Sequence, residues 1–337
     1  MKKHMMPVWM FWLAAMLPAA ARANDSSAML GAGGIVLVAN DMVRLESEDL
    51  FISPSEIRIR YEFLNEGTED FTTEVAFPLP DIDLAMLSET GIATPTDDPV
   101  NFVGFSVQVD GRPVEFSGEM RAFAGDKDVT ALLVAQAIPV SRFVEGFYET
   151  LQQADEDARK VLSDAGVVFW DDFGNVYPKW TMRTIYHWQQ LFPVGKKVVV
   201  EHRYKPVLGL SFFSGYDLEA LHAAPEAEED MGWSIGKAYC MTPQQEEVVK
   251  SMLEHLQGQD YPVLSSAVLQ YILTTANNWS GPIGRFRMEV ALDRPKQVMA
   301  TCMKGLVEET PGKLVFSARG FVPEHEVDLL FLNALSE

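Results

Sequence analysis

The sequence predicts a mainly β fold: a β-sandwich with a helical insertion, followed by a smaller α+β C-terminal domain. The first observation is an alternation of apolar and polar residues, clearest in EIRIRYEFL at residues 56–64, where every second side chain would face a core. Clusters of Gly, Pro, Asn and Asp separate such stretches, as turns separate strands. Helical patterns are confined mainly to residues 128–166 and 242–256, and this is the third observation.

The first 23 residues predict a secretory signal peptide. Lys2 and Lys3 precede a short apolar run at residues 8–17, and Ala21-Arg22-Ala23 is a small-x-small cleavage site. The mature chain would therefore begin at Asn24, in the periplasm or outside the cell. No later stretch reaches the about 18 apolar residues that a membrane-spanning helix needs, so no membrane span is expected after signal removal.

The chain is strongly acidic, with a net charge of −21. The signal segment carries Lys2, Lys3 and Arg22 and no acid, so its removal takes the net charge from −21 to −24. This balance disfavours binding to nucleic acid or to anionic lipid, because both need a positive protein surface.

Residues 24–210 are predicted to form the β-sandwich domain. Asp110-Gly111 is a strong hairpin signal, and Pro78-Leu79-Pro80 marks a strand edge or exit, because proline donates no ladder hydrogen bond. A second hairpin is predicted from residues 180–188 and 197–204. The remaining strands are predicted at residues 35–38, 72–77, 102–109 and 112–116.

A helical insert at about 128–166 divides this domain in sequence. Three short helices are expected there, beginning at Asp128, Ser141 and Asp155, whose side chains can accept hydrogen bonds from the first helical turn. Gly166 supplies the stop, because glycine readily adopts the left-handed conformation that ends helices.

An acidic, loop-like segment at 211–236 is predicted to link the sandwich to the C-terminal domain, 237–337. Thr242 begins a helix there, since Pro243 suits the first helical position and Gln245 completes a capping box. Residues 267–274 and 286–292 alternate and flank a run of turn residues, which predicts two strands joined by a turn.

Cys240 and Cys302 are the two cysteines of the chain. In an exported protein they most simply form one disulfide. The alternative is a catalytic thiol, which needs a basic neighbour, and neither Ala238–Cys240 nor Thr301–Met303 supplies one in sequence.

The mature chain contains five distinctive stretches: NDSSAMLGAGGIVLV, SEDLFISPSEIRIRYEF, VAFPLPDI, YHWQQLFPVGKKVVVEHRYKPVLG and YILTTANNWSGPIGRFRMEV. They resemble a bacterial exported family known as domain of unknown function 4424. The resemblance spans nearly the whole mature chain and implies a secreted or periplasmic protein, but it brings no activity with it. FPLP, VDGRPV and FPVGKKVVVEHRY are more weakly similar to the vault/inter-alpha-trypsin β domain, which implies a β-sandwich.

His187 and His202 form a candidate metal pair. If the turn between their strands is centred on Val194-Gly195, the two imidazoles stand opposite each other across a hairpin. No third ligand is visible, and cross-strand polar pairing without a metal is the simpler interpretation, so no metal site is assigned.

A set of aspartates near tryptophans raises the alternative of a carbohydrate-active or other hydrolase, because glycan hydrolysis uses paired carboxyl groups. Their proline and glycine neighbours are instead typical of turn acids, so no catalytic residue is assigned. The set comprises Asp81, Asp83, Asp97, Asp98, Asp171 and Asp172.

An aromatic and basic strip is the candidate binding surface, made of Arg183, His187 and Trp188, with Trp279 in the later connection. Burial of the aromatic residues in the sandwich is the competing interpretation, and for Trp279 it is the favoured one. The sequence thus favours a non-catalytic binding or structural module without a cofactor, whose partner is a cell-envelope protein or a glycan.

Overall fold

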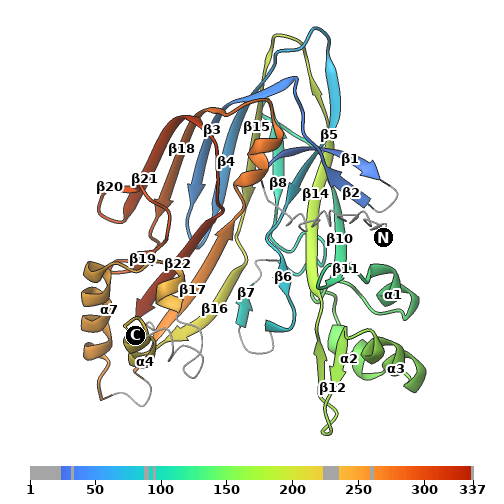
Figure 1. Ribbon diagram of the computed structural model, residues 1–337, viewed down its shortest axis with the longest axis vertical. Coiled ribbons are helices and arrows are strands. Elements are labelled where there is room, and N and C mark those ends of the chain that lie inside the picture. Colours follow the sequence, from blue (N-terminus) through green and yellow to red (C-terminus); the bar gives the residue numbers. More distant parts are fainter. Residues whose placement is uncertain are drawn as a thin grey trace, which may run out of the picture.

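The computed structural model describes residues 24–31, 34–86, 91–93, 96–222, 235–258 and 262–334. The predicted signal peptide lies outside the described residues. The fold is mainly β, as predicted, with its strands arranged in three larger sheets and one short hairpin (Figure 1). No helix in the described ranges is long and apolar enough to cross a membrane.

Two large sheets form the sandwich. The seven-stranded sheet runs in the order β11 (Lys127–Asp128), β10 (Ser117–Ala124), β14 (Thr181–Phe192), β5 (Phe71–Pro78), β1 (Ser26–Gly31) and β2 (Gly34–Leu37), with β6 (Ile82–Asp83) also paired to β14. The eight-stranded sheet runs β20 (Val307–Thr310), β21 (Lys313–Phe321), β18 (Ile283–Ala291), β3 (Val43–Ile52), β4 (Ile57–Asn65), β15 (Lys197–Tyr204), β8 (Ser106–Val109) and β9 (Arg112–Pro113).

An aromatic core lies between these two sheets. Phe63 of β4 packs edge-on against Phe192 of β14, with ring centroids 5.6 Å apart. The rings of Trp188 in β14 and His202 in β15 are also in contact, with their centroids 5.3 Å apart. The alternation seen in EIRIRYEFL accounts for this core, because Ile57, Ile59, Tyr61 and Phe63 are all buried and the intervening side chains are not.

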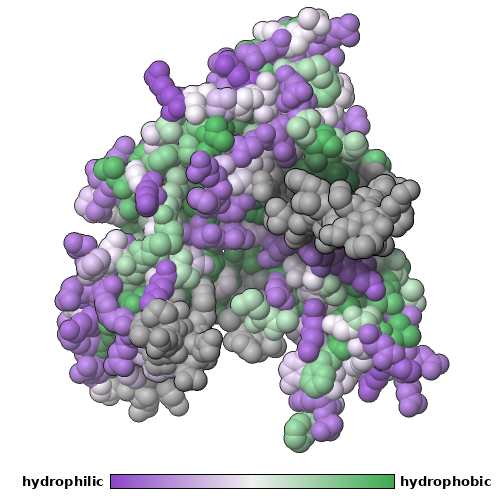
Figure 2. All heavy atoms as spheres, viewed as in Figure 1, coloured by the Kyte–Doolittle hydropathy of each residue, from purple (hydrophilic) through white to green (hydrophobic). Residues whose placement is uncertain are grey.

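The third large sheet has five strands. Its order is β19 (Val298–Ala300), β22 (Val327–Ala334), β17 (Leu264–Tyr271), β16 (Leu208–Phe213) and β7 (Gly91–Ala93). Helix α7 (Pro243–His255) packs on it through Val249 and Leu253, and its outward surface is mostly hydrophilic (Figure 2). The short helix α4 (Gly215–Ala220) contacts α7, and the short helix α6 (Ile235–Ala238) contacts α4. Thr242 caps α7 in the predicted capping box.

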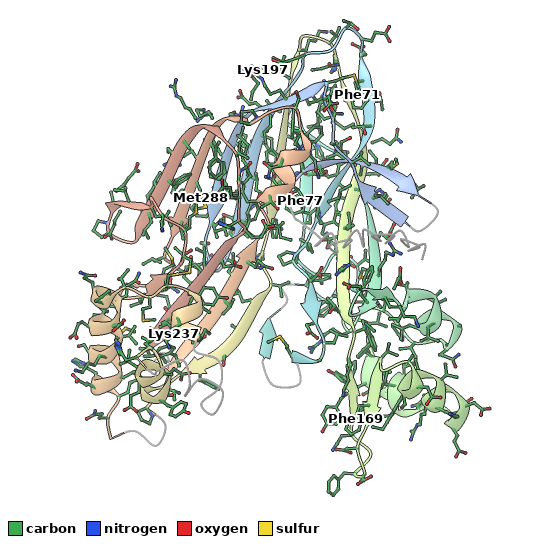
Figure 3. The ribbon with its side chains drawn as sticks, in the orientation of Figure 1. Phe71, Phe77, Phe169, Lys197, Lys237 and Met288 are labelled. Atoms are coloured by element: carbon green, nitrogen blue, oxygen red, sulfur yellow. A yellow bond between two sulfur atoms is a disulfide. The ribbon has the colours of Figure 1, made fainter. Side chains whose placement is uncertain are left out.

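The helical insertion is present, although its helices are shorter than expected. It comprises α1 (Thr130–Ala135), α2 (Phe147–Gln152), α3 (Glu156–Asp164) and the hairpin of β12 (Val168–Trp170) with β13 (Val176–Pro178). Asp155 caps α3 as predicted, but α1 and α2 follow Val129 and Gly146 rather than Asp128 and Ser141. The β12–β13 hairpin, which carries Phe169, extends to the end of the molecule opposite Lys197 (Figure 3).

Two of the predicted strand pairs are wrong. Strands β14 and β15 do not form a hairpin, because β14 pairs with β10 and β5 whereas β15 pairs with β4 and β8. Strands β17 and β18 also lie in different sheets, and the 3-10 helix η3 (Thr274–Asn278) connects them. A period-two pattern shows which face of a strand is buried, but it does not show which strand lies beside it.

The sheets cross the predicted domain boundary. Strand β18 pairs in parallel with β3, so the eight-stranded sheet combines strands from both sides of the segment 211–236. The five-stranded sheet likewise combines β7 and β16 with β17 and β22. The division into domains at 24–210 and 237–337 therefore stays a prediction about folding units, because it does not coincide with a break between sheets.

The two cysteines are joined. The sulfur atoms of Cys240 and Cys302 lie 2.00 Å apart, across a sequence separation of 62 residues. Replacing both with serine should lower the free energy of unfolding by about 4 kcal/mol, since the unfolded chain gains the entropy of an open loop. Urea unfolding of the variant, compared with the unreduced protein, measures this difference. An unchanged urea midpoint would contradict the entropic account.

Candidate binding face

The predicted histidine pair is not formed. His187 lies on the seven-stranded sheet, where its Nδ1 contacts the carboxylate of Glu74. His202 projects from the other sheet into the core and its Nε2 is 2.9 Å from Oδ1 of Asp25. The two imidazoles cannot face each other across a hairpin, because their strands belong to different sheets. Within the described ranges, no group of three or more His, Cys, Asp or Glu residues could hold a metal ion.

The predicted binding strip is not one surface. Trp188 and Trp279 are each only 3% exposed, so both belong to the core, as the competing interpretation expected. Arg183 stays at the surface, but its Nε donates to Oδ2 of Asp81 at 2.9 Å and its guanidinium lies 4.0 Å from the ring centre of Phe123.

The aspartates considered for hydrolysis are engaged mostly in their own turns. Asp83 accepts a hydrogen bond from the amide of Ala85, and Asp98 accepts from two amides that follow it. Asp171 accepts from the amide of Asn175 at 2.8 Å, while Asp81 pairs with Arg183. These local contacts are those of turn acids, and none of them brings two members of the set together.

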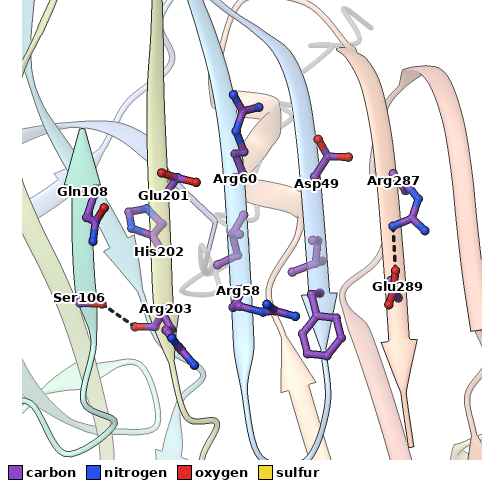
Figure 4. Close-up of a pocket in the computed structure, with 13 residues that line it drawn as sticks. Asp49, Arg58, Arg60, Ser106, Gln108, Glu201, His202, Arg203, Arg287 and Glu289 are labelled. Atoms are coloured by element: carbon purple, nitrogen blue, oxygen red, sulfur yellow. Dashed lines mark hydrogen bonds and ion pairs between the residues drawn. The ribbon is translucent and has the colours of Figure 1, made fainter. Parts of the chain in front are cut away.

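The outer surface of the eight-stranded sheet gathers charged side chains that sequence analysis did not bring together. Because the inward residues of β4 fill the core, Arg58 and Arg60 point outward. Strand register then places side chains from β8, β15, β3 and β18 beside them in two rows (Figure 4). We define the charged face as these ten residues: Gln108, Glu201, Arg60, Asp49 and Arg287 in one row, and Ser106, Arg203, Arg58, Phe51 and Glu289 in the other.

Opposite charges alternate along the first row. Glu201 lies opposite Arg60 on the neighbouring strand, Arg60 lies opposite Asp49, and Asp49 lies opposite Arg287. Cross-strand neighbours of opposite charge attract one another. Hydrogen bonds hold these side chains to other groups nearby: Arg60 donates to Glu62 at 2.8 Å, Arg285 donates to Asp49, and Arg287 donates to Glu289 at 3.0 Å. The row therefore presents an ordered sequence of acceptor and donor groups across several strands.

The second row contains the one aromatic ring of the charged face. The guanidinium carbon of Arg58 lies 4.2 Å from the ring centre of Phe51, which is a cation–π contact. Arg58 also forms an ion pair with Glu56, 3.1 Å from Nε to Oε2, and its side chain is 53% exposed. An exposed ion pair contributes little to folding stability. A carboxylate of a partner could therefore replace Glu56 beside Arg58 at little cost to the fold.

A shallow hollow of about 390 Å³ lies over the charged face. Its volume is at the lower end for small-molecule sites, and its lining is more polar than is usual for them. A second hollow of about 320 Å³ adjoins it through Ser106 and Arg203. Arginine guanidinium groups bind carboxylates in a two-pronged geometry, so the charged face is chemically suited to contact with a charged, polar surface.

Sequence analysis did not identify this face as a candidate site. The alternation along β4 predicts only that Arg58 and Arg60 point outward. Asp49, Glu201 and Arg287 come from strands distant in sequence, and only the register of the sheet brings them next to β4.

Comparisons with known proteins place the chain without assigning an activity. The family model described as "Domain of unknown function (DUF4424)" matches residues 23–330. A crystal structure from Legionella pneumophila, described as a "putative nutrient binding protein", is similar with a TM-score of 0.43 and 14% identity, over 92% of this chain and 72% of that chain. No curated protein matches, and the similarity to the vault/inter-alpha-trypsin β domain finds no support in these comparisons.

Proposed function

The chain belongs to the DUF4424 family, and on that premise we propose that it is a non-catalytic binding module of the cell envelope. Its recognition surface is the charged face of the eight-stranded sheet. The alternating row of Glu201, Arg60, Asp49 and Arg287 carries this proposal, because it brings arginines and carboxylates together on one surface of an otherwise strongly acidic chain.

The chemistry of the charged face favours a protein partner over a neutral glycan. Arginine is enriched in protein interfaces and often contributes most of the binding energy there. Glycans are commonly bound on open aromatic rings, but the ring of Phe51 lies under the guanidinium of Arg58. A partner segment that carries both acids and bases would match the alternation. The predicted signal peptide supports a location in the envelope or outside the cell.

Removal of two arginines tests this proposal. The double variant Arg58→Ala/Arg60→Ala should capture at least tenfold less partner from envelope extracts, because loss of a central arginine commonly costs more than about 1 kcal/mol of binding. Binding by the wild type should also weaken as salt rises, because the contacts are between exposed charges. Quantitative mass spectrometry of captured proteins measures both effects.

A matched control removes the same charge elsewhere. Lys127→Ala/Lys160→Ala changes two exposed residues of β11 and α3, outside the charged face, and should leave capture unchanged. If both double variants captured less partner than the wild type, and by the same factor, net charge rather than the charged face would govern binding. Retention of the wild type on purified envelope glycans, with no protein captured, would exclude the protein partner.

A further inference from the structure

The first described residues lie inside the protein. Asn24 and Asp25, which precede β1, are fully buried. The hydroxyl of Thr275 donates to the carbonyl oxygen of Asn24 at 2.8 Å, and the indole Nε1 of Trp279 donates to that of Asp25 at 2.6 Å. The hydroxyl of Tyr61 also donates to Oδ1 of Asn24. These contacts hold the backbone and the side chain of Asn24 in place.

Two buried carboxyl groups lie in the same cluster. Nδ2 of Asn24 donates to Oε2 of Glu48 at 3.1 Å, and the Tyr271 hydroxyl lies 3.4 Å from Oε1 of Glu48. Oδ1 of Asp25 is 2.9 Å from Nε2 of His202, whereas Oδ2 of Asp25 has no hydrogen-bond partner among the described residues. The titratable groups of the cluster come from the segment before β1 and from β3, β4, β15 and β17; they are Asp25, Glu48, Tyr61, His202 and Tyr271.

Among the described residues, no lysine or arginine neutralises the two carboxyl groups of the cluster. His202 contacts Asp25, but within the described chain no Lys or Arg side chain forms an ion pair with Glu48 or Asp25. Burial raises the pKa of Asp25 and raises the pKa of Glu48 to about 8. A buried carboxylate without a cation is costly, so a cation beside Glu48 would stabilise the folded protein.

The backbone nitrogen of Asn24 is close enough to supply it. Four covalent bonds separate this nitrogen from Nδ2, so the two atoms are at most about 5 Å apart. Since Nδ2 is 3.1 Å from Glu48 Oε2, the backbone nitrogen lies within about 8 Å of that carboxylate. A unit charge at this distance still attracts the carboxylate, because a buried site screens charges less than bulk water does.

We propose that the chain is cleaved between Ala23 and Asn24, and that the new α-ammonium of Asn24 is the buried counter-ion of Glu48. Hydrolysis of this peptide bond consumes one water, leaves a carboxylate on Ala23 and frees the amine of Asn24, which takes up a proton. The predicted small-x-small site at Ala21-Arg22-Ala23 ends at the bond whose cleavage places the amine in the cluster. Processing therefore completes the interior charge balance.

Chemical labelling of the exported protein tests the proposal. Intact mass should show a chain that begins at Asn24. Its α-amine should react with an amine-specific reagent at least 100-fold more slowly in the folded protein than in urea. A chain with Gly-Ser inserted after Ala23 is the control, because its terminal amine lies two residues before Asn24 and should react at nearly the unfolded rate. A different first residue, or equal folded and unfolded rates in the wild type, would overturn the proposal.

The pKa of the α-amine separates an ion pair from simple burial. A carboxylate neighbour raises it above the ordinary value of about 7.7–8.0, whereas burial without a counter-ion lowers it. The pH dependence of labelling should give a raised value in the wild type and a lower one in Glu48→Gln. If that variant does not fold, the α-amine pKa of the wild type is sufficient for the test. A value below the ordinary range would refute the ion pair.

Discussion

Replacing Trp279 with alanine is expected to lower the free energy of unfolding by about 5 kcal/mol or more. The indole is 3% exposed and packs against Phe63 and Phe192, with ring centroids 4.8 and 5.7 Å away. Truncation of a buried tryptophan leaves a cavity that costs about 3–5 kcal/mol. It also removes the donor to the Asp25 carbonyl oxygen, and a buried acceptor left without a partner adds about 1–3 kcal/mol.

A solvent-exposed aromatic residue provides the control for this measurement. Phe173, at the turn between β12 and β13, is 91% exposed, so Phe173→Ala should change the free energy of unfolding by less than about 0.5 kcal/mol. Denaturant titration of both variants gives the comparison. If Trp279→Ala were as stable as Phe173→Ala, the placement of the indole between the sheets would be contradicted.

Trp279 also shows which features of this fold can be predicted from local sequence and which cannot. Turn residues around it correctly indicate a break after β17, but they do not indicate that η3 turns back into the core. The connection between β14 and β15 is a second case in which local sequence predicts the turn but not the pairing of the strands. Its turn is real, yet the two strands separate into opposite sheets, because pairing depends on contacts between segments far apart in sequence. The capping box at Thr242 needs only neighbouring residues, and the structure confirms it.

Glu48 could not be placed in the interior from its sequence, and the reason is a single irregularity. The ladder between β3 and β4 shifts register between Leu45 and Ser47. One extra residue in a strand exchanges its two faces beyond that point, so Glu48 joins Leu45 and Leu50 on the buried side. The same shift turns Asp49 outward to the charged face. One bulge therefore positions both the buried acid and part of the candidate binding site.

The pH dependence of stability is the second large effect that we expect. Consider the chain with Gly-Ser inserted after Ala23, in which the Asn24 nitrogen stays in a peptide bond. The pKa of Glu48 should be about 8 in the folded state and near its ordinary 4.5 in the unfolded state. Between these pH values the folded state holds a proton that the unfolded state has lost, so stability falls as pH rises. The loss attributable to Glu48 should total about 5 kcal/mol.

Glu48→Gln in the same inserted chain isolates this contribution, because glutamine does not titrate and the other ionisable groups are shared. The difference in unfolding free energy between the two chains should change steeply from pH 4.5 to pH 8. If it stays constant, Glu48 is not buried as the structure places it. In the processed protein the α-ammonium should lower the pKa of Glu48, so the same comparison should give a much smaller change. If the pH-dependent change were equal in the inserted and processed chains, the burial of Glu48 would be supported but the α-ammonium would not be its counter-ion. The comparison therefore tests these two claims separately.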